Sequence, residues 1–387
     1  MARQYATFRR LVFLVSTTLI LCMQTIVGHA EDKLLNEAVE FNGALVFLGT
    51  KVPGFVFGAV RNGETAFAGF GEFADGTGKA PDRNTMFRIG SVSKAFCGSV
   101  LTSLVVDGKV RLTDHLQDRL GYDLVLPEKE GHALRLIDLV TQASGLPREV
   151  PRPPAPDDDP FSTNTKEAQT AALKQDPLWF APATSVLYSN FGFDLLGAAL
   201  ANVAGKPYAE LLRERVLAPL GLKDTVSNPG PADKSRLMQG HNLDGSPMPQ
   251  VPTPVSIECA GGLHSTANDL LRWISWHVDN KPSSSDSELR LLNHAALLYR
   301  DGLRSVRGVD DGGPMDAMGL GWVIMLPEGN RPLILQKSGG LQGIFIYVAL
   351  APTRGVGAFF VMNEFSVAGF PAAVKSTNDL IEQLAPR

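Results

Sequence analysis

Apolar and polar residues follow two different periods along the chain. Near its start, short runs rich in Val and Phe are separated by Pro-Gly and Asn-Gly turn signals, which predicts strands at residues 44–49, 55–60 and 65–71. Over residues 92–106 the apolar side chains recur on one stripe of a helix, and Asp107 with Gly108 forms a stop signal. A β-rich start therefore leads into an apolar helix.

Helical spacing dominates the middle of the chain, and strand spacing returns after residue 315. Thr266, with Asp269 three residues later, is a favourable helix start. Proline and acidic residues predict a loop at 150–166, and the polar run at 281–287 predicts a flexible surface connection. The predicted helices are 134–144, 190–205, 207–221, 266–278 and 371–384, and the predicted late strands are 320–326, 332–338, 344–351 and 355–363.

Because strands lie at both ends and helices lie between them, we expect an α+β fold with one antiparallel sheet built from both termini and flanked by helices. It forms a single domain at residues 31–387, with an α/β lobe at 31–106 and 315–387 and a mainly helical lobe inserted at 107–314. A chain of 387 residues with 44% apolar residues can bury a core of that size.

The first thirty residues have the pattern of a secretory signal peptide. Arg3, Arg9 and Arg10 precede an apolar run at 11–27, and small residues follow. We expect cleavage after Ala30 and a periplasmic protein. An uncleaved membrane anchor is the alternative, but 17 residues that include threonine and glutamine are marginal for a span. We therefore expect membrane association to be peripheral at most.

Charge and cysteine content narrow the function classes further. Removal of residues 1–30 takes three arginines and no acids, which leaves 33 basic and 40 acidic side chains and a net charge of −7. This acidity argues against nucleic acid as a partner. The two remaining cysteines, Cys97 and Cys259, could pair in an oxidising compartment, but we favour two buried, unreactive thiols. Oligomeric state is left open.

Three short motifs each occur once in the chain. Taken singly, each has a structural explanation: a helix N-cap, a half-buried aromatic residue and a charge at a strand end. Their order and their setting, at a helix start, in a loop before a helix and at a strand, indicate one catalytic site. They are S-x-x-K (Ser91, Lys94), Y-x-N (Tyr188, Asn190) and K-[ST]-G (Lys337, Ser338, Gly339).

Motifs in this order resemble those of the serine acyl-enzymes, the penicillin-binding proteins and serine β-lactamases. The resemblance spans residues 35–385 and is to the class C branch, with class C β-lactamases, low-molecular-weight DD-peptidases and related esterases. It is carried by segments such as "GSVSKAF", "LYSNFGFDLLG", "AGGLHSTANDLLRW" and "LQKSGG". Within the branch the sequence most resembles D-alanyl-D-alanine carboxypeptidase/endopeptidases of the AmpH type. A β-lactamase/transpeptidase-like fold is implied.

The spacing within S-x-x-K puts Ser91 and Lys94 on one face of a helix, one turn apart. Ser91 is then the nucleophile and Lys94 its base, provided that burial and the charge of Lys337 lower the pKa of Lys94. Tyr188 is suited to pass a proton to the leaving nitrogen. By the family pattern, the backbone N–H groups of Ser91 and Gly340 form the oxyanion hole.

The remaining motif residues are expected to bind substrate. Asn190 suits the substrate amide, and Lys337 and Ser338, with Gly339 after them, suit a substrate carboxylate. Class C β-lactamases tend to carry Gln where this chain has Glu149, at the border of the cleft, and Tyr where it has Gly261. These departures favour a peptidase over a β-lactamase.

We expect no cofactor and no metal. The chain has no H-E-x-x-H or C-x-x-C motif, and we interpret His264 as a residue of the active-site rim. The histidines after the leader are His115, His132, His241, His264, His277 and His294.

The predicted function is a periplasmic serine DD-peptidase that acts on peptidoglycan stem peptides and is acylated by β-lactams. A class C β-lactamase is the first alternative. A serine esterase or D-amino-acid amidase, and a penicillin sensor that stays acylated, are the others. They differ in deacylation, which depends on the position of one water molecule.

Overall fold

The computed structural model describes residues 32–385, so the leader and its cleavage site lie outside the described residues. Within that part of the chain, no helix is both long and apolar enough to cross a bilayer. The helices are α2 (Lys33–Thr50), α3 (Ser93–Val106), α4 (Leu116–Arg119), α5 (Leu136–Val140), α6 (Lys166–Leu173), α7 (Asn190–Ala204), α8 (Tyr208–Leu212), α9 (Ala267–Val278), α10 (Ser284–Asn293) and α11 (Gly369–Leu384).

Most of the strands are short, and the longest lie near the two ends of the chain. They are β1 (Gly54–Arg61), β2 (Glu64–Gly71), β3 (Met86–Arg88), β4 (Glu128–Lys129), β5 (His132–Ala133), β6 (Val186–Leu187), β7 (His264–Thr266), β8 (Leu298–Tyr299), β9 (Val306–Arg307), β10 (Ala317–Met318), β11 (Val323–Met325), β12 (Ile334–Leu341), β13 (Ile344–Ala351) and β14 (Val356–Met362).

Eight of these strands form one sheet in the order β2-β1-β14-β13-β12-β11-β10-β8, and every neighbouring pair is antiparallel. The two ends of the chain meet where β1 pairs with β14, from Phe55 opposite Met362 to Arg61 opposite Val356. The predicted α+β fold, with one antiparallel sheet assembled from both ends, is confirmed.

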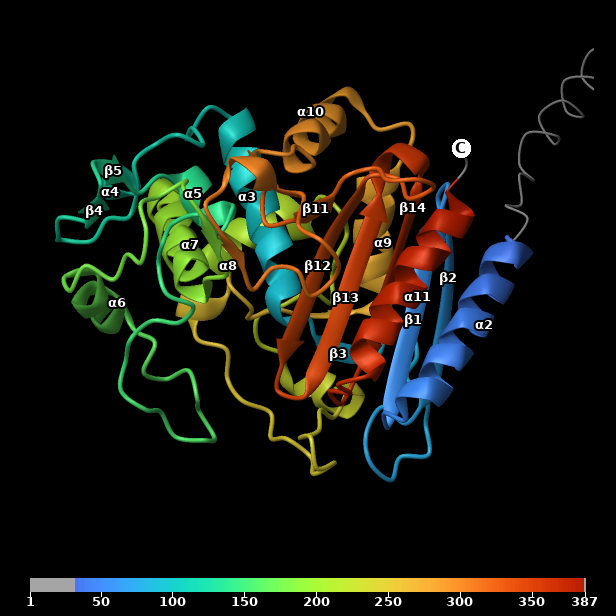
Figure 1. Ribbon diagram of the computed structural model, residues 1–387. Coiled ribbons are helices and arrows are strands. Elements are labelled where there is room, and N and C mark those ends of the chain that lie inside the picture. The colour runs from blue at the N-terminus through green and yellow to red at the C-terminus, as the bar shows by residue number, and fades with distance from the viewer. Residues whose placement is uncertain (1–31, 386–387) are drawn as a thin grey trace, which may run out of the picture. The chain divides into compact units, whose positions relative to one another are not determined.

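Alternation along the strands gives the sheet two buried faces. Phe55 and Phe57 of β1 pack in one core with residues of α2 and α11, whereas Val56 and Val60 pack in the other core with residues of α3 and α9. Figure 1 shows α11 crossing the sheet beside α2, and helices α5 to α8 gathered on the far side of α3. The sheet is therefore covered by helices on both faces, and α3 is deeply buried.

Two predictions from local composition are wrong. Residues 44–49 are helical, because their Val and Phe belong to a longer pattern over α2 whose buried positions, from Leu35 and Val39 to Val46, are three or four residues apart. Residues 284–293 form α10 rather than a flexible connection, because the Ser283 side chain caps the helix by accepting a hydrogen bond from Asp286 N. The remaining predicted strands and helices are confirmed, with shifted ends, and residues 150–165 hold no helix or strand.

The expectation of two unpaired thiols is also wrong. Cys97 on α3 and Cys259, 162 positions apart in the sequence, form a disulfide with their Cα atoms 5.3 Å apart. Both residues are buried. The fold brings together two cysteines whose separation in sequence says nothing about their distance, and the bond fixes the segment around Cys259 to the helix that follows Ser91.

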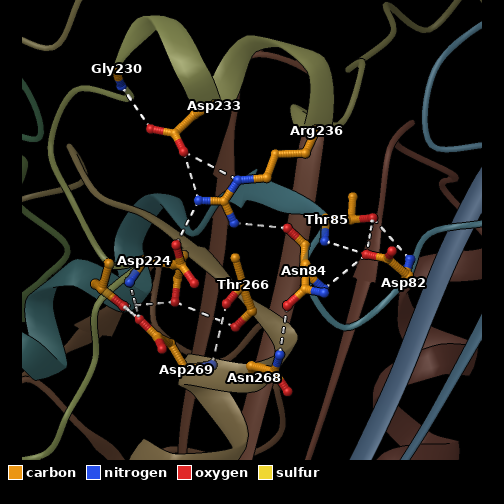
Figure 2. Close-up of polar contacts among 12 residues, drawn as sticks. Asp82, Asn84, Thr85, Asp224, Gly230, Asp233, Arg236, Thr266, Asn268 and Asp269 are labelled. Carbon is orange, nitrogen blue, oxygen red and sulfur yellow. Dashed lines mark hydrogen bonds and ion pairs between the residues drawn. The ribbon is translucent and has the colours of Figure 1, made fainter.

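A polar network fixes the surroundings of β3 and β7. Figure 2 shows Arg236 between Asp224 and Asp233, each with a carboxylate oxygen 2.6 Å from Nη2. Arg236 Nη1 also donates to Asn84 O, 3.0 Å away, and Asn268 Nδ2 donates to Asn84 Oδ1, 2.8 Å away. The network ties the segment before β3 to the start of α9, which follows β7, so the two strands are held as an antiparallel pair.

Candidate active site

Ser91 lies where β3 ends and α3 is about to begin. It is part of a short 3₁₀ turn, η1 (Gly90–Val92), and its side chain caps no helix. The neighbouring Ser93 takes the local structural role instead, since its Oγ donates to Gly90 O (2.7 Å) and accepts from Leu263 N (3.2 Å). The hydroxyl of Ser91 is therefore left for other partners.

Lys94 lies one turn after Ser91 and is fully buried. Its Nζ is 3.3 Å from Ser91 Oγ, 2.6 Å from Asn190 Oδ1 and 2.5 Å from Ala260 O. A neutral amine has two N–H donors and one lone pair. The amide and carbonyl oxygens can only accept, so they take the two donors and leave the lone pair for the Ser91 hydroxyl proton. The geometry suits a general base.

Burial lowers the pKa of Lys94 to about 7, against the opposing effect of the Asp194 and Glu149 carboxylates. Burial was one of the two expected causes, and Lys337 was the expected neighbouring cation. In the structure burial is the larger cause, and Arg148 is the cation that adds to it. Near neutral pH, a large fraction of Lys94 is therefore neutral.

The Y-x-N motif brackets the start of α7. Ser189 caps this helix through its Oγ, which accepts from Gly192 N (2.9 Å), and this places Tyr188 just before the cap and Asn190 at the first helical position. Tyr188 OH donates a hydrogen bond to Ser91 Oγ. The Tyr188 and Lys94 side chains therefore meet at the same serine oxygen.

Three basic side chains surround the ring of Tyr188. Lys94 Nζ is 4.9 Å from the ring centroid, Lys337 Nζ is 5.2 Å away and Arg148 Cζ is 4.7 Å away. A positive field of this kind stabilises negative charge that develops on the Tyr188 or Ser91 oxygen during proton transfer.

Strand β12 brings the third motif alongside Ser91. Lys337 is buried, which lowers its pKa, and its Nζ donates to Ser338 O (2.9 Å). A Cβ atom at Gly339 would lie 2.3 Å from Ile89 O and 3.0 Å from Ser91 N, and one at Gly90 would lie 2.8 Å from Gly340 N. Only glycine permits this approach, which brings the backbone N–H groups of Ser91 and Gly340 into one neighbourhood.

Glu149 and Gly261 border the same space. Glu149 Oε1 accepts a hydrogen bond from Asn190 Nδ2 (2.6 Å), so the carboxylate is connected to Lys94 through Asn190. A Cβ atom at Gly261 would lie 3.7 Å from Gly90 C and 3.9 Å from Ser91 N, which are ordinary contact distances. A side chain would fit at Gly261, and its absence leaves room beside Ser91.

The main cleft has a volume of about 490 Å³ and contains Ser91, Tyr188, Lys337 and Ser338. Sequence reasoning missed several of its lining residues. Arg148 is adjacent to Glu149 in sequence and was a readable signal. The apolar wall from the start of β13, the segment after β14 and the start of α11 gave no signal, because its residues look like ordinary core positions. Its aromatic members are Phe345, Phe365 and Phe370.

His264 is not at the rim of the site. It is buried in β7, opposite Arg88, and its Nδ1 lies 3.1 Å from Ser227 O. Burial and the Arg88 charge lower the pKa of His264 to about 3, so the ring is neutral. Among residues 32–385, no group of three or more His, Cys, Asp or Glu side chains has an arrangement that could hold a metal ion.

The family model described as Beta-lactamase matches residues 32–378. The chain belongs to the β-lactamase family. Its fold, with a large antiparallel sheet between helices, is the fold of solved β-lactamase and carboxypeptidase structures in this family.

Relatives within the β-lactamase family include peptidases and β-lactamases. The chain is 31% identical over 373 residues to the D-alanyl-D-alanine-carboxypeptidase/endopeptidase AmpH of Escherichia coli strain K12, with 95% of each chain covered. It is 28% identical over 344 residues to a β-lactamase of Pseudomonas fluorescens, with 81% of this chain and 89% of that protein covered.

Among solved structures, the β-lactamase/D-alanine carboxypeptidase of Yersinia pestis, complexed with citrate, matches with a TM-score of 0.83 and 31% identity over 91% of this chain and 98% of that chain. The class C β-lactamase of Rhodobacter sphaeroides shares the fold, with a TM-score of 0.72 at 22% identity over 90% of this chain and 99% of that chain.

Proposed function

We propose that this protein is a serine DD-peptidase that removes or cleaves after D-alanine in peptidoglycan stem peptides through an acyl-enzyme on Ser91. The observation that carries the proposal is the convergence of Lys94 Nζ and Tyr188 OH on Ser91 Oγ, with Lys94 held by two acceptors that cannot donate. The likeness to a D-alanyl-D-alanine-carboxypeptidase/endopeptidase over 95% of the chain supports the substrate class.

Acylation would proceed by proton transfer from Ser91 to neutral Lys94 as Oγ attacks the carbonyl carbon of the scissile bond. The backbone N–H groups of Ser91 and Gly340 would receive the oxyanion. The hydroxyl of Tyr188 would pass its proton to the leaving nitrogen and take up the proton held by Lys94, so that Tyr188 and neutral Lys94 are both restored. Lys94 and Tyr188 would each act through the contact that they already make with Ser91 Oγ.

Substrate binding would use the opposite wall of the cleft. Lys337 and Ser338 would hold the carboxylate of the terminal D-alanine, one through its charge and the other through its hydroxyl. Asn190 would bind the substrate amide, Gly339 would keep the strand close, and Glu149 would border the peptide. A β-lactam carries an amide and a carboxylate in similar positions, so it would acylate the same serine.

We place the protein in the periplasm, where stem peptides are found. The leader pattern at residues 1–30 supports export, and the buried disulfide between Cys97 and Cys259 is typical of oxidising compartments.

The second candidate is a class C β-lactamase. Its support is the presence of β-lactamases among the relatives. Against it stand Glu149 and Gly261, which replace the Gln and Tyr expected at those positions of class C β-lactamases.

Labelling with a fluorescent penicillin tests the acyl-enzyme. Wild-type protein should be labelled at Ser91, as mapped by mass spectrometry, and Ser91→Ala should lose the label with an unchanged melting temperature, since no core volume changes. Label on Ser93 or Ser338, or label retained by Ser91→Ala, would show that the assignment is wrong.

A further inference from the structure

Asp194 is a buried carboxyl for which acylation has no use. It lies on α7 one turn after Asn190 and is 3% exposed. Its Oδ2 accepts a hydrogen bond from Asn164 Nδ2 (2.8 Å), whereas its Oδ1 has no hydrogen-bond partner among the described residues. Burial raises its pKa well above the usual range. A buried polar atom without a partner calls for an explanation, and bound water is a common one.

Asp194 lies in the wall between two pockets. The front pocket, of about 60 Å³, is lined by Ser91, Asn190, Gly261 and Gly340 as well as Asp194. This volume is enough for water but too small for a large peptide side chain. The front pocket therefore joins Asp194 to the atoms at which an acyl group would be attached and stabilised.

The back pocket, of about 250 Å³, is lined by Asp194, Tyr208 and Ser256, and its α7 residues continue from Asp194 to Ala201. The hydroxyls of Tyr208 and Ser256 are buried and, like Asp194 Oδ1, lack a hydrogen-bond partner among the described residues. Three such oxygens around one space of this size indicate a hydrated pocket. Val255, which also lines it, is 67% exposed, so this pocket reaches solvent.

A chain of side-chain hydrogen bonds holds Asp194 in this wall. Tyr122 OH donates to Gln169 Oε1 (2.6 Å), Gln169 Nε2 donates to Asn164 Oδ1 (3.3 Å), and Asn164 Nδ2 donates to Asp194 Oδ2. The orientation of Asn164 is fixed from both sides, so its amide nitrogen faces Asp194, and Oδ1 remains the oxygen of Asp194 without a hydrogen-bond partner among the described residues.

We propose that Asp194 is a positioning residue for deacylation, and that it holds the attacking water in the front pocket beside the Ser91 ester. The proposal rests on the proposed acyl-enzyme function. The water oxygen forms the new bond to the ester carbon, and one water proton passes to neutral Lys94. That proton then returns to Ser91 Oγ as the carbon–Oγ bond breaks, which leaves a free acid and the original enzyme.

The glycine at position 261 is part of the same arrangement, because it keeps the front pocket open. A methyl group there would make only ordinary contacts with the backbone of Gly90 and Ser91, so Gly261→Ala should fold normally while it takes up space that water needs. The proposal therefore predicts that two chemically unrelated substitutions, at Gly261 and at Asp194, slow the same step.

Asp194→Asn replaces Oδ1, which accepts a hydrogen bond from water when Asp194 is ionised, with an NH₂ group that can only donate. Asn164 Nδ2 still requires an acceptor, so the new amide must present its oxygen to Asn164 and its NH₂ group to the water. The water is then held through the lone pair that should attack. Asp269→Asn is a matched control, since Asp269 is also buried with one oxygen that lacks a hydrogen-bond partner, but it lies by Thr225, outside both pockets.

The experiment uses a linear acyl-D-Ala-D-lactate ester with the protein that begins at Glu31. Quenched-flow mass spectrometry would measure formation and loss of the Ser91 acyl-enzyme. Asp194→Asn and Gly261→Ala should each slow its loss by about tenfold or more, the scale on which misplacement of a reacting group acts. Its formation should change less than about threefold, and Asp269→Asn should match wild type in both steps.

Loss of the acyl-enzyme within about twofold of wild type in both variants would overturn the role of Asp194 and leave the acyl-enzyme function intact. An equal slowing of formation and loss would also overturn it, because a general structural effect would then be the explanation. Absence of any Ser91 acyl-enzyme in wild-type protein would instead refute the proposed function on which the inference rests.

Discussion

The disulfide between Cys97 and Cys259 should contribute a large part of the stability of the protein. It closes a loop over 162 positions of sequence. The chain-entropy relation for a loop of that length gives about 5 kcal/mol at about 25 °C, through the restriction of the unfolded chain. A typical domain is stable by roughly 5–15 kcal/mol, so the reduced protein should be marginal.

The bond should also matter for catalysis, because of what lies beside it. Cys97 is one turn beyond Lys94 on α3, and Cys259 precedes Ala260, whose carbonyl oxygen accepts the Lys94 hydrogen bond at 2.5 Å. Reduction would free this segment to move. Without that acceptor the lone pair of Lys94 would no longer be directed at Ser91, and acylation should slow.

Urea unfolding followed by fluorescence tests the magnitude. Oxidised wild type would be compared with Cys97→Ala/Cys259→Ala, which leaves the segment unlinked at a small cost in volume. The free energy of unfolding should fall by about 3–5 kcal/mol, because engineered and native disulfides often deliver less than the entropy relation gives. A fall below about 1 kcal/mol, or alkylation of both thiols in the native exported protein, would refute the reasoning.

The remaining predictions concern the active site. Lys94→Ala should slow acylation by roughly 10²- to 10⁴-fold, the usual effect of losing a general base, and an equal rate in the variant would rule Lys94 out. The acylation rate of wild type should rise with pH through about 7, because protonated Lys94 cannot accept the Ser91 proton, and a rate that falls over this range would contradict the assignment. Lys337→Ala should lower kcat/KM more for substrates with a free carboxylate than for neutral esters. Equal losses for both substrate classes would show that Lys337 does not bind the carboxylate and acts only through its charge. Gly339→Ala should slow acylation by roughly 100-fold, because its Cβ would push β12 away from Ser91, whereas Gly49→Ala, with open space around it, should have no effect.

Much of the fold could be predicted from the sequence because its signals are local. The continuous apolar runs of β13 and β14, the helical stripe of α3 and the capped start of α9 each depend on neighbouring residues only. The strand prediction for residues 44–49 was wrong because it relied on a local signal alone. A window of six residues with Val and Phe reads as a strand, and only the longer pattern back to Leu35 identifies the helix.

The candidate site could be predicted where it depends on side chains in short motifs, and not where it depends on tertiary contacts. The carbonyl of Ala260 leaves no trace in sequence, since every residue has one, yet it completes the surroundings of Lys94. The pairing of Cys97 with Cys259 and the unpartnered oxygen of Asp194 likewise arise from packing. The prediction that His264 lies at the rim of the site was wrong, because its segment is close to Gly261 but β7 turns its side chain into the core.

The most direct test of the central claim is a comparison of two substrates under one buffer. The protein that begins at Glu31 would be given a pentapeptide muropeptide, with D-alanine release measured by mass spectrometry, and a chromogenic cephalosporin. We predict a higher kcat/KM for the muropeptide than for the cephalosporin in the wild-type protein. This order follows from the likeness to a D-alanyl-D-alanine-carboxypeptidase/endopeptidase over 95% of the chain, and from Glu149 and Gly261 at the positions where class C β-lactamases tend to carry Gln and Tyr. Ser91→Ala should have no activity on either substrate. A kcat/KM for the cephalosporin far above that for the muropeptide would contradict the account and indicate a class C β-lactamase.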